Sequence, residues 1–322
     1  MDINKAYKSG KLDLRSRIVL PPMATEKSDE GLVTEDLCDY YKERAENPLI
    51  GLIITEHMFI SMQGRASRGQ LSIASDDVTE GLRRLTDTIH RAGDGIRVFA
   101  QINHAGGKAD PSLTGAQPVS SSVCDFKYAQ SRELSIDEIH SIADTFAEAA
   151  FRARKAGYDG VEIHSAHGYL LNQFYSPLVN KRADEYGASC MEDRLRFHKE
   201  VIEKVRAAVG EDYPIAVRLG GCDYQQGGST EADAVEAAKL LIGYGADMID
   251  VSGGMNGYII AGHDYPGYFK DMSAAIKKAV NVPVITTGGV TKPEEAEELL
   301  SEGAADLIGV GRALYKDAGW GC

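Results

Sequence analysis

Residues 135–164 read SIDEIHSIADTFAEAAFRARKAGYDGVEIH, a long amphipathic stretch that leads directly into a short apolar one. Ser135 and Glu138 have the spacing of a capping box, in which both side chains bond free backbone N–H groups at a helix start. Apolar residues follow at helical spacing: Ile139, Ile142, Phe146 and Ala149. Gly157 suits the end of this helix. Gly160–His164 is nearly continuous in hydrophobicity, as strands buried on both faces are. The stretch therefore predicts the helix-then-strand unit of an α/β protein.

Short apolar runs of the same kind recur along the whole chain. The others are Ile18–Leu20, Leu49–Thr55, Val98–Ile102, Pro214–Leu219, Met248–Val251, Val282–Thr286 and Leu307–Val310. Helical patterns fall between them, for example after Thr34 and between Thr291-x-Pro293 and Gly303. Eight strands alternating with helices predict an α/β fold of the (β/α)8 TIM barrel type, with a doubly wound open sheet as the alternative. No linker or composition break divides the chain, so we expect residues 1–322 to form a single barrel domain.

The connections between these elements differ in length. Long loops rich in glycine, serine or aromatic residues are expected at 103–133, 165–190 and 253–270. Each follows a strand, so all three should lie at the C-terminal face of the barrel, where barrel enzymes carry their active sites. Only a short tail follows Gly311, so we expect a shortened last helix or a truncated chain.

Composition and charge exclude several classes of protein. The 322 residues include 35 Lys+Arg and 48 Asp+Glu, for a formal net charge of −13, and 43% are hydrophobic. These values argue against a disordered chain and against a nucleic-acid partner. No signal-peptide core and no run long enough to span a membrane is present, so we expect a cytoplasmic protein without membrane contact. The five scattered cysteines include no C-x-x-C pair, which argues against a zinc ribbon or a cysteine-bound iron–sulfur cluster.

Glycines and an arginine follow the last two predicted strands. Gly288 and Gly289 come after the seventh strand, and Gly311 and Arg312 come after the eighth. Barrels bind phosphate in these two loops, because glycine lets backbone N–H groups approach an anion and arginine adds charge. The sequence therefore predicts a phosphate site here, with plain turn glycines as the alternative. The third glycine of a dinucleotide fingerprint is missing, which disfavours a Rossmann site.

Histidines and polar side chains mark the ends of the middle strands. His164 ends the fourth predicted strand, and His167 and Tyr169 follow it. Two imidazoles can stabilise negative charge on one oxygen, and a tyrosine hydroxyl can give up a proton. No third ligand at metal-binding spacing accompanies the two histidines, so we expect no metal; structural histidines are the other reading. Gln101 and Arg218 end the third and fifth strands and suit a large, flat, polar-edged cofactor.

Taken together, these segments resemble the old yellow enzyme family of FMN-dependent ene-reductases over nearly the whole chain. The matching motifs are RIVLPPM at 17–23, QINHA at 101–105, GYDGVEIHSAHGYLL at 157–171 and FYSPLVNKRADEYGAS at 174–189. Longer relatives carry a cysteine cluster and a pyridine-nucleotide domain after the barrel. This chain resembles a short form without them.

The resemblance implies an FMN at the top of the barrel and assigns residues to it. Pro22, Met23 and Ala24 should lie along the flavin ring together with His57. Gln101 should bond the pyrimidine side and Arg218 should lie near N1. The phosphate contacts should come from Gly288, Gly289, Gly311 and Arg312. Ala24 and His57 depart from residues common in the family, so both should alter flavin potential or specificity.

The resemblance also implies a reaction. NADH or NADPH should reduce the flavin, which then reduces the activated C=C bond of an α,β-unsaturated carbonyl compound. His164 and His167 should bind the carbonyl oxygen, and Tyr169 should be the proton donor. Glu26 and Tyr258 should contact this small-molecule substrate. The identity of the substrate, the choice of NADH or NADPH and the formation of a homo-oligomer stay open.

Other functions were compatible with parts of the pattern. A flavin-free aldolase or synthase barrel would need a lysine at a strand end, and none is found there. An amine-oxidising or demethylating flavoprotein would need an aromatic cage, for which Tyr258, Tyr265, Tyr268 and Phe269 are candidates. A dienoyl-reductase-like enzyme fed by a partner protein is a further alternative, as is a flavin-binding protein without activity.

Overall fold

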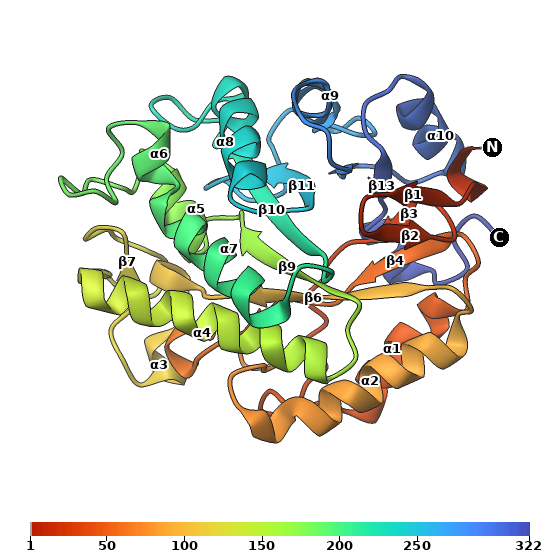
Figure 1. Cartoon of the computed structure of the whole chain (residues 1–322), viewed down its shortest axis with the longest axis horizontal. Helices are drawn as coiled ribbons and strands as arrows, with labels where there is room; N and C mark the ends of the chain where they lie inside the picture. Colours follow the sequence, from red (N-terminus) through yellow and green to blue (C-terminus); the bar gives the residue numbers. More distant parts are fainter. Residues whose placement is uncertain (1) are drawn as a thin grey trace.

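The computed structural model describes residues 2–322, and its centre is a closed barrel of parallel strands surrounded by helices (Figure 1). The strands follow one another around the barrel in chain order: β3 (Ile18–Leu20), β4 (Ile50–Ile54), β6 (Arg97–Asn103), β9 (Gly160–Ser165), β10 (Ile215–Cys222), β11 (Met248–Gly253), β12 (Val284–Thr286) and β13 (Leu307–Gly309). Pairing of β13 with β3 closes the ring. The predicted barrel and its eight strands are confirmed, and the open-sheet alternative is wrong.

A helix follows each barrel strand, and the last of these helices lines the cavity described below. These helices are α1 (Glu35–Ala45), α2 (Thr79–Ala92), α4 (Ile136–Lys155), α7 (Arg196–Val209), α8 (Glu231–Gly243), α9 (Lys270–Ala279), α10 (Pro293–Ser301) and α11 (Arg312–Lys316). The capping box of Ser135 and Glu138 at α4 is confirmed. Thr291 does not cap α10, because Lys292 holds that position and the Glu295 carboxylate accepts the N–H of both residues. The last helix is short, as expected.

A two-stranded hairpin that was not predicted closes the N-terminal end of the barrel. It consists of β1 (Tyr7–Ser9) and β2 (Leu12–Leu14). Leu12 and Leu14 are buried in one cluster with inward-facing barrel residues such as Met248 and Leu307. Tyr7 packs against the same cluster, and the other hairpin residues are polar or glycine, so the hairpin had no long apolar run that could have predicted its role. With this end filled, the open face of the barrel is the C-terminal one.

The long loops at the C-terminal face carry short elements of their own. These are β5 (Met58–Phe59), α3 (Pro111–Thr114), β7 (Val119–Ser120), β8 (Arg132–Glu133), α5 (Leu170–Tyr175), α6 (Met191–Arg194) and the 3-10 turns Met62–Gly64, Asp76–Val78 and Gly106–Lys108; a further 3-10 turn, Asp2–Asn4, precedes β1. The buried carboxylate of Asp223 joins three loops, since it accepts hydrogen bonds from the Ser176 hydroxyl (2.6 Å), the Ser229 N–H (2.8 Å) and the Met255 N–H (2.7 Å). These bonds fix the loop that carries Tyr258 over the barrel mouth.

None of the helices in residues 2–322 has the length and apolar character needed to span a membrane.

Candidate active site

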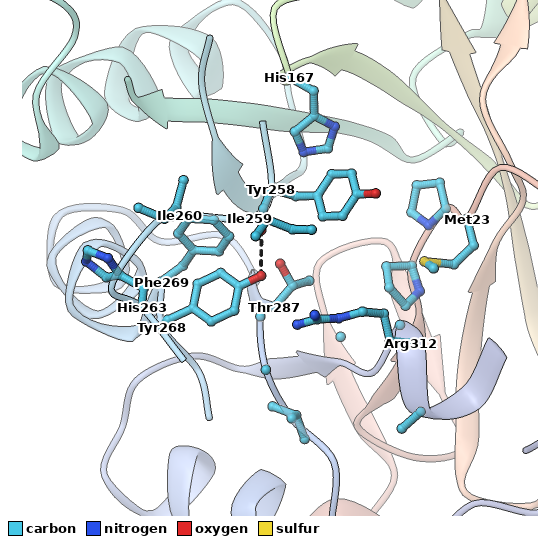
Figure 2. Close-up of a pocket in the computed structure, with 18 of the residues that line it drawn as sticks. Met23, His167, Tyr258, Ile259, Ile260, His263, Tyr268, Phe269, Thr287 and Arg312 are labelled. Atoms are coloured by element: carbon cyan, nitrogen blue, oxygen red, sulfur yellow. Dashed lines mark hydrogen bonds between the residues drawn. The ribbon is translucent and has the colours of Figure 1, made fainter. Parts of the chain in front are cut away.

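A cavity of about 1030 Å³ opens at the C-terminal face and is lined by residues from most of the barrel strands (Figure 2). Nearly all the residues predicted for the site line it: Pro22, Met23, Ala24, His57, Gln101, His164, His167, Tyr169, Arg218, Tyr258, Gly288, Gly289, Gly311 and Arg312. Glu26 does not. A volume of this size is at the upper end for small-molecule sites and has room for a cofactor and a substrate together.

The glycine-rich end of the cavity lies over β12 and β13. Gly288 and Gly289 have φ angles of 103° and 74°, in the left-handed region that favours glycine. A Cβ atom at Gly288 would lie 2.7 Å from the Tyr268 ring, so the position excludes larger residues on steric grounds as well. Figure 2 shows the Arg312 side chain reaching into the cavity, into which Thr287 also points. No hydrogen bond or ion pair joins the Arg312 guanidinium to another residue in the 2–322 range, which leaves it free for an anion.

Beneath the middle of the cavity lies a layer of buried polar side chains. Gln101 donates a hydrogen bond to Glu162 (2.6 Å), and Arg218 Nε lies 3.3 Å from the Asp250 carboxylate. Glu162 Oε1, both Asp250 oxygens and Arg218 Nε have no hydrogen-bond partner within the described residues. Burial raises the pKa of both carboxyls, and the charge of Asp250 raises that of Glu162 further, while Arg218 lowers both.

This layer fits a flavin. Gln101 and Arg218 both line the cavity and offer it an amide and a guanidinium, which match the polar edge of a flavin ring. Sequence reasoning missed Glu162 and Asp250. The available signal was a carboxylate inside each of two otherwise apolar strand runs, GVEIH and MIDV, because charges are rarely fully buried without a partner.

His164 and His167 line the same part of the cavity, with ring centroids 5.1 Å apart. His164 Nδ1 accepts the Ala166 N–H (3.2 Å), so the proton of the neutral ring lies on Nε2. His167 Nε2 lies 2.7 Å from the Ser252 hydroxyl. Burial lowers the pKa of both rings well below the usual value, and neighbouring positive groups lower it further, so both are neutral at pH 7.

The turn that carries His167 is strained and held on several sides. His167 has a φ of 58°, unusual for a residue other than glycine, and Gly168 follows at 69°. Lys108 donates to the His167 carbonyl (2.6 Å), and the Gly168 N–H donates to Asn172 (2.8 Å). Lys108 is itself largely buried, which lowers its pKa. The surroundings therefore fix the orientation of His167.

Tyr169 lies against His164, with ring centroids 5.0 Å apart in an edge-to-face arrangement. Burial, and secondarily the charge of Glu26, raises the pKa of its hydroxyl to about 12. The hydroxyl therefore stays protonated over the physiological pH range. It makes no hydrogen bond to another residue among 2–322, so its proton is available to a ligand.

The two predicted substrate contacts have different positions. Glu26 is outside the cavity: its carboxylate accepts hydrogen bonds from the Ser67 hydroxyl (2.5 Å) and the Gly69 N–H (2.9 Å). Its charge still affects the site, since it raises the pKa of Tyr169 and opposes the lowering of that of His57. Tyr258 is 52% exposed at the cavity rim, and its ring lies 5.5 Å from that of His167.

The four aromatic residues considered for a cage do not surround one point. Tyr265 does not line the cavity. Tyr268 donates its hydroxyl to the Tyr258 carbonyl (2.5 Å), and its ring packs against Phe269 near the glycine-rich end (Figure 2). Only Tyr258 contacts a histidine of the pair, so the arrangement does not favour a cationic substrate.

Other residues of the site carried little signal in the sequence. Thr287 lines the cavity and donates its hydroxyl to the Val251 carbonyl (3.2 Å). Trp320, from the short tail, also lines it and donates Nε1–H to the Thr291 carbonyl (2.7 Å). Ser252 could have been found as a hydroxyl residue at the end of a predicted strand, the rule that identified Gln101 and Arg218.

Comparisons with known proteins place this geometry in context. Residues 5–321 match the profile of the NADH:flavin oxidoreductase / NADH oxidase family. The chain is 42% identical over 320 residues to an NADH oxidase of Thermoanaerobacter brockii, covering 97% of the chain and 48% of that protein. It is 39% identical over 323 residues to an NADPH dehydrogenase of Clostridium acetobutylicum, covering 98% and 92%. The solved old yellow enzyme homologue of Zymomonas mobilis superposes with a TM-score of 0.84 at 30% identity, covering 98% and 89%. The chain spans about half the length of the NADH oxidase and of a metal reductase that it also matches.

Proposed function

Because the chain belongs to the NADH:flavin oxidoreductase / NADH oxidase family, which includes the old yellow enzymes, we propose that it reduces activated C=C bonds of α,β-unsaturated carbonyl compounds. The family match and the relatives indicate FMN as the prosthetic group and NADH or NADPH as the electron donor. When bound, FMN would supply the hydride-transfer chemistry between the nicotinamide and the alkene. The observation that carries the proposal is the cluster of His164, His167 and Tyr169 beside the flavin-sized cavity.

Groups of this chain that line the cavity suit the parts of FMN. Arg312, Gly288, Gly289 and Gly311 would hold the phosphate, since backbone N–H groups and a free guanidinium bind phosphate oxygens well. Gln101 and Arg218 would bond the pyrimidine edge of the ring. Pro22, Met23 and Ala24 also line the cavity, where backbone groups could contact the ring.

The histidine pair would bind the carbonyl oxygen of the substrate. Two neutral imidazole N–H groups can converge on one oxygen and stabilise the negative charge that develops there when a hydride adds to the alkene. Their low pKa values suit this role, because a neutral donor stabilises the developing charge without transferring a full proton to the oxygen. Tyr169, protonated and without another partner, would give its proton to the second alkene carbon.

The proposed function is tested by the visible spectrum of the purified protein without oxygen. We expect flavin bands that bleach on addition of NADH or NADPH and return on addition of cyclohex-2-enone. Bands that bleach with NADH but do not return with enones would contradict ene-reduction. Bands that fail to bleach with either nucleotide, while dithionite followed by an enone completes the second step, would favour a separate electron-donor protein, as in the dienoyl-reductase-like alternative.

Replacement of His164 by alanine is expected to weaken phenol binding by about tenfold or more, since a charge-assisted hydrogen bond to the phenolate oxygen is lost. Phenols stand in for the substrate, because their oxygen occupies the place of the carbonyl oxygen. The measurement is a titration of the oxidised protein with 4-methylphenol, followed by the long-wavelength charge-transfer absorption. An unchanged titration would exclude His164 from the oxygen site.

A further inference from the structure

A third histidine lines the same cavity from a different part of the barrel. His57 lies between β4 and β5, and its ring stacks on Tyr169 with centroids 5.4 Å apart and planes 26° apart. It also lies edge-on to His164 at 6.3 Å. The proposed reaction needs two imidazoles for one oxygen, so His57 has no role in it so far. We infer that His57 is an additional hydrogen-bond donor to the substrate, and that it selects alkenes with a carbonyl group at each end, such as enediones.

The hydrogen bonds of Gln70 fix which nitrogen of His57 carries the proton. The Gln70 side-chain oxygen accepts the Ala66 N–H (2.7 Å), so its other end is the NH2 group. That NH2 group donates to the His57 carbonyl (3.2 Å) and lies 3.0 Å from His57 Nδ1. Nδ1 is therefore an acceptor, and the Asn103 amide at 3.2 Å supplies a second donor to it. The proton of the neutral ring must then lie on Nε2.

The Nε2–H group of His57 has no partner in the part of the chain that the structure describes. None of the hydrogen bonds of residues 2–322 involves it, and the side chain lines the cavity. Two amide donors hold the opposite side of the ring, so the ring cannot turn this N–H away without losing both bonds. Burial lowers the pKa of His57 to about 4, against the opposing charge of Glu26, so the group is a neutral donor at pH 7. A donor that is fixed in this way and open to the cavity is positioned to donate a hydrogen bond to a ligand.

The position of Tyr169 indicates which ligand. Its ring contacts both His164 and His57, and the three ring centroids form a triangle with sides of 5.0, 5.4 and 6.3 Å. The proposed function, on which this inference rests, places one carbonyl oxygen on the histidine pair and the alkene beside Tyr169. Because the His57 and His164 ring centroids are 6.3 Å apart, a second acceptor at the other end of the alkene would then lie within reach of His57. The substrate class is thus an alkene flanked by two acceptors.

Selectivity follows from the cost of leaving a buried donor without a partner. A substrate that fills the cavity displaces water from His57 Nε2–H. A simple enone has no second oxygen to accept this hydrogen bond, so the unpaired N–H lowers its affinity. The second carbonyl oxygen of an enedione accepts the bond in place of the water. Sites built to bond a polar substrate group discriminate strongly against analogues that lack it.

The test uses two ketones that differ by one carbonyl: 2,6,6-trimethylcyclohex-2-ene-1,4-dione and 2,6,6-trimethylcyclohex-2-enone. Dissociation constants are measured by perturbation of the flavin absorption of the oxidised protein, and kcat/KM is measured for each ketone. The variant is His57→Phe, which keeps a ring to stack on Tyr169 and removes the N–H. The preference for the dione is the ratio of the dissociation constant of the enone to that of the dione. We expect this ratio to fall by about tenfold or more in the variant. The intrinsic reactivity of the two ketones cancels when variants are compared.

Two further variants separate hydrogen bonding from stacking. His57→Asn keeps an N–H donor and is expected to retain part of the preference. Gln70→Met removes one of the two donors to Nδ1, so the proton is held less firmly on Nε2, and the preference is expected to fall less than in His57→Phe. Gln70→Met also tests the inference if the His57→Phe protein does not bind FMN. An equal preference in wild type, His57→Phe and Gln70→Met would overturn the inference and leave His57 a packing residue. A wild-type protein that reduces neither ketone would instead overturn the proposed function.

Discussion

Replacement of Tyr169 by phenylalanine is expected to slow alkene reduction by about 100- to 10,000-fold, the usual contribution of a general acid, while reduction of the flavin by NADH or NADPH stays intact. The proton that Tyr169 would supply is needed only when the alkene carbon is protonated. The nicotinamide gives up a hydride without it.

The structure favours Tyr169 as the proton source because of what surrounds it. Its pKa of about 12 keeps the hydroxyl protonated, and no side chain among residues 2–322 competes for that proton. Phenylalanine preserves the ring that packs against His164 and His57, so the cavity should keep its shape. The substitution thus removes one hydroxyl group and little else.

The two steps are measured separately by stopped-flow absorption. Anaerobic mixing with NADH or NADPH reports flavin reduction, and mixing of the reduced protein with cyclohex-2-enone reports reoxidation. The expected result is a slow second step beside an unchanged first step. A variant that reoxidises as fast as the wild type would show that water or another residue supplies the proton.

The sequence was sufficient to predict the barrel because parallel strands buried on both faces leave a strong pattern. All eight runs, from Ile18–Leu20 to Leu307–Val310, became barrel strands within a few residues. Polar residues at the ends of those runs then had to meet at one face, since the strands are parallel. That rule brought Gln101, His164 and Arg218 to the cavity without any knowledge of loop structure.

What the sequence could not predict depended on contacts between distant segments. Glu26 was expected to contact the substrate, but Ser67 and Gly69, which lie in another loop, bind its carboxylate outside the cavity. The orientation of His57 depends on Gln70 and Asn103. Neither arrangement has a local signature, because loop positions are set by tertiary packing rather than by periodicity.

Replacement of Arg218 by methionine is expected to destabilise the flavin-free protein by about 3–5 kcal/mol at pH 8, the usual cost of removing one partner from a buried ion pair. Arg218 is the positive group that lowers the pKa of both Glu162 and Asp250, and both carboxyls are fully buried. Without it, two carboxylates would face each other in the interior with only Gln101 as a donor.

The destabilisation should depend on pH, with a sign that follows from the direction of the pKa shifts. Both carboxyls have a higher pKa in the folded than in the unfolded protein. Above the unfolded values the folded state therefore binds more protons, and stability falls as pH rises until the folded values are passed. Removing Arg218 raises the folded values further, so the fall should be steeper and extend to higher pH. The free energy of unfolding of the variant should be close to that of the wild type at pH 5 and far below it at pH 8.

Chemical unfolding of the protein stripped of FMN, at pH 5 and pH 8, measures this effect without the contribution of flavin binding, which would itself stabilise the native state. Glu162→Gln is the matched control: it removes one of the two titrating carboxyls, keeps the hydrogen-bonding shape and should flatten the pH dependence. Combined with Arg218→Met, it should recover much of the stability at pH 8, because a single carboxyl can stay protonated without a charged neighbour. Equal destabilisation by Arg218→Met at both pH values would mean that Arg218 acts through packing. Its charge would then not stabilise the ionised forms of Glu162 and Asp250.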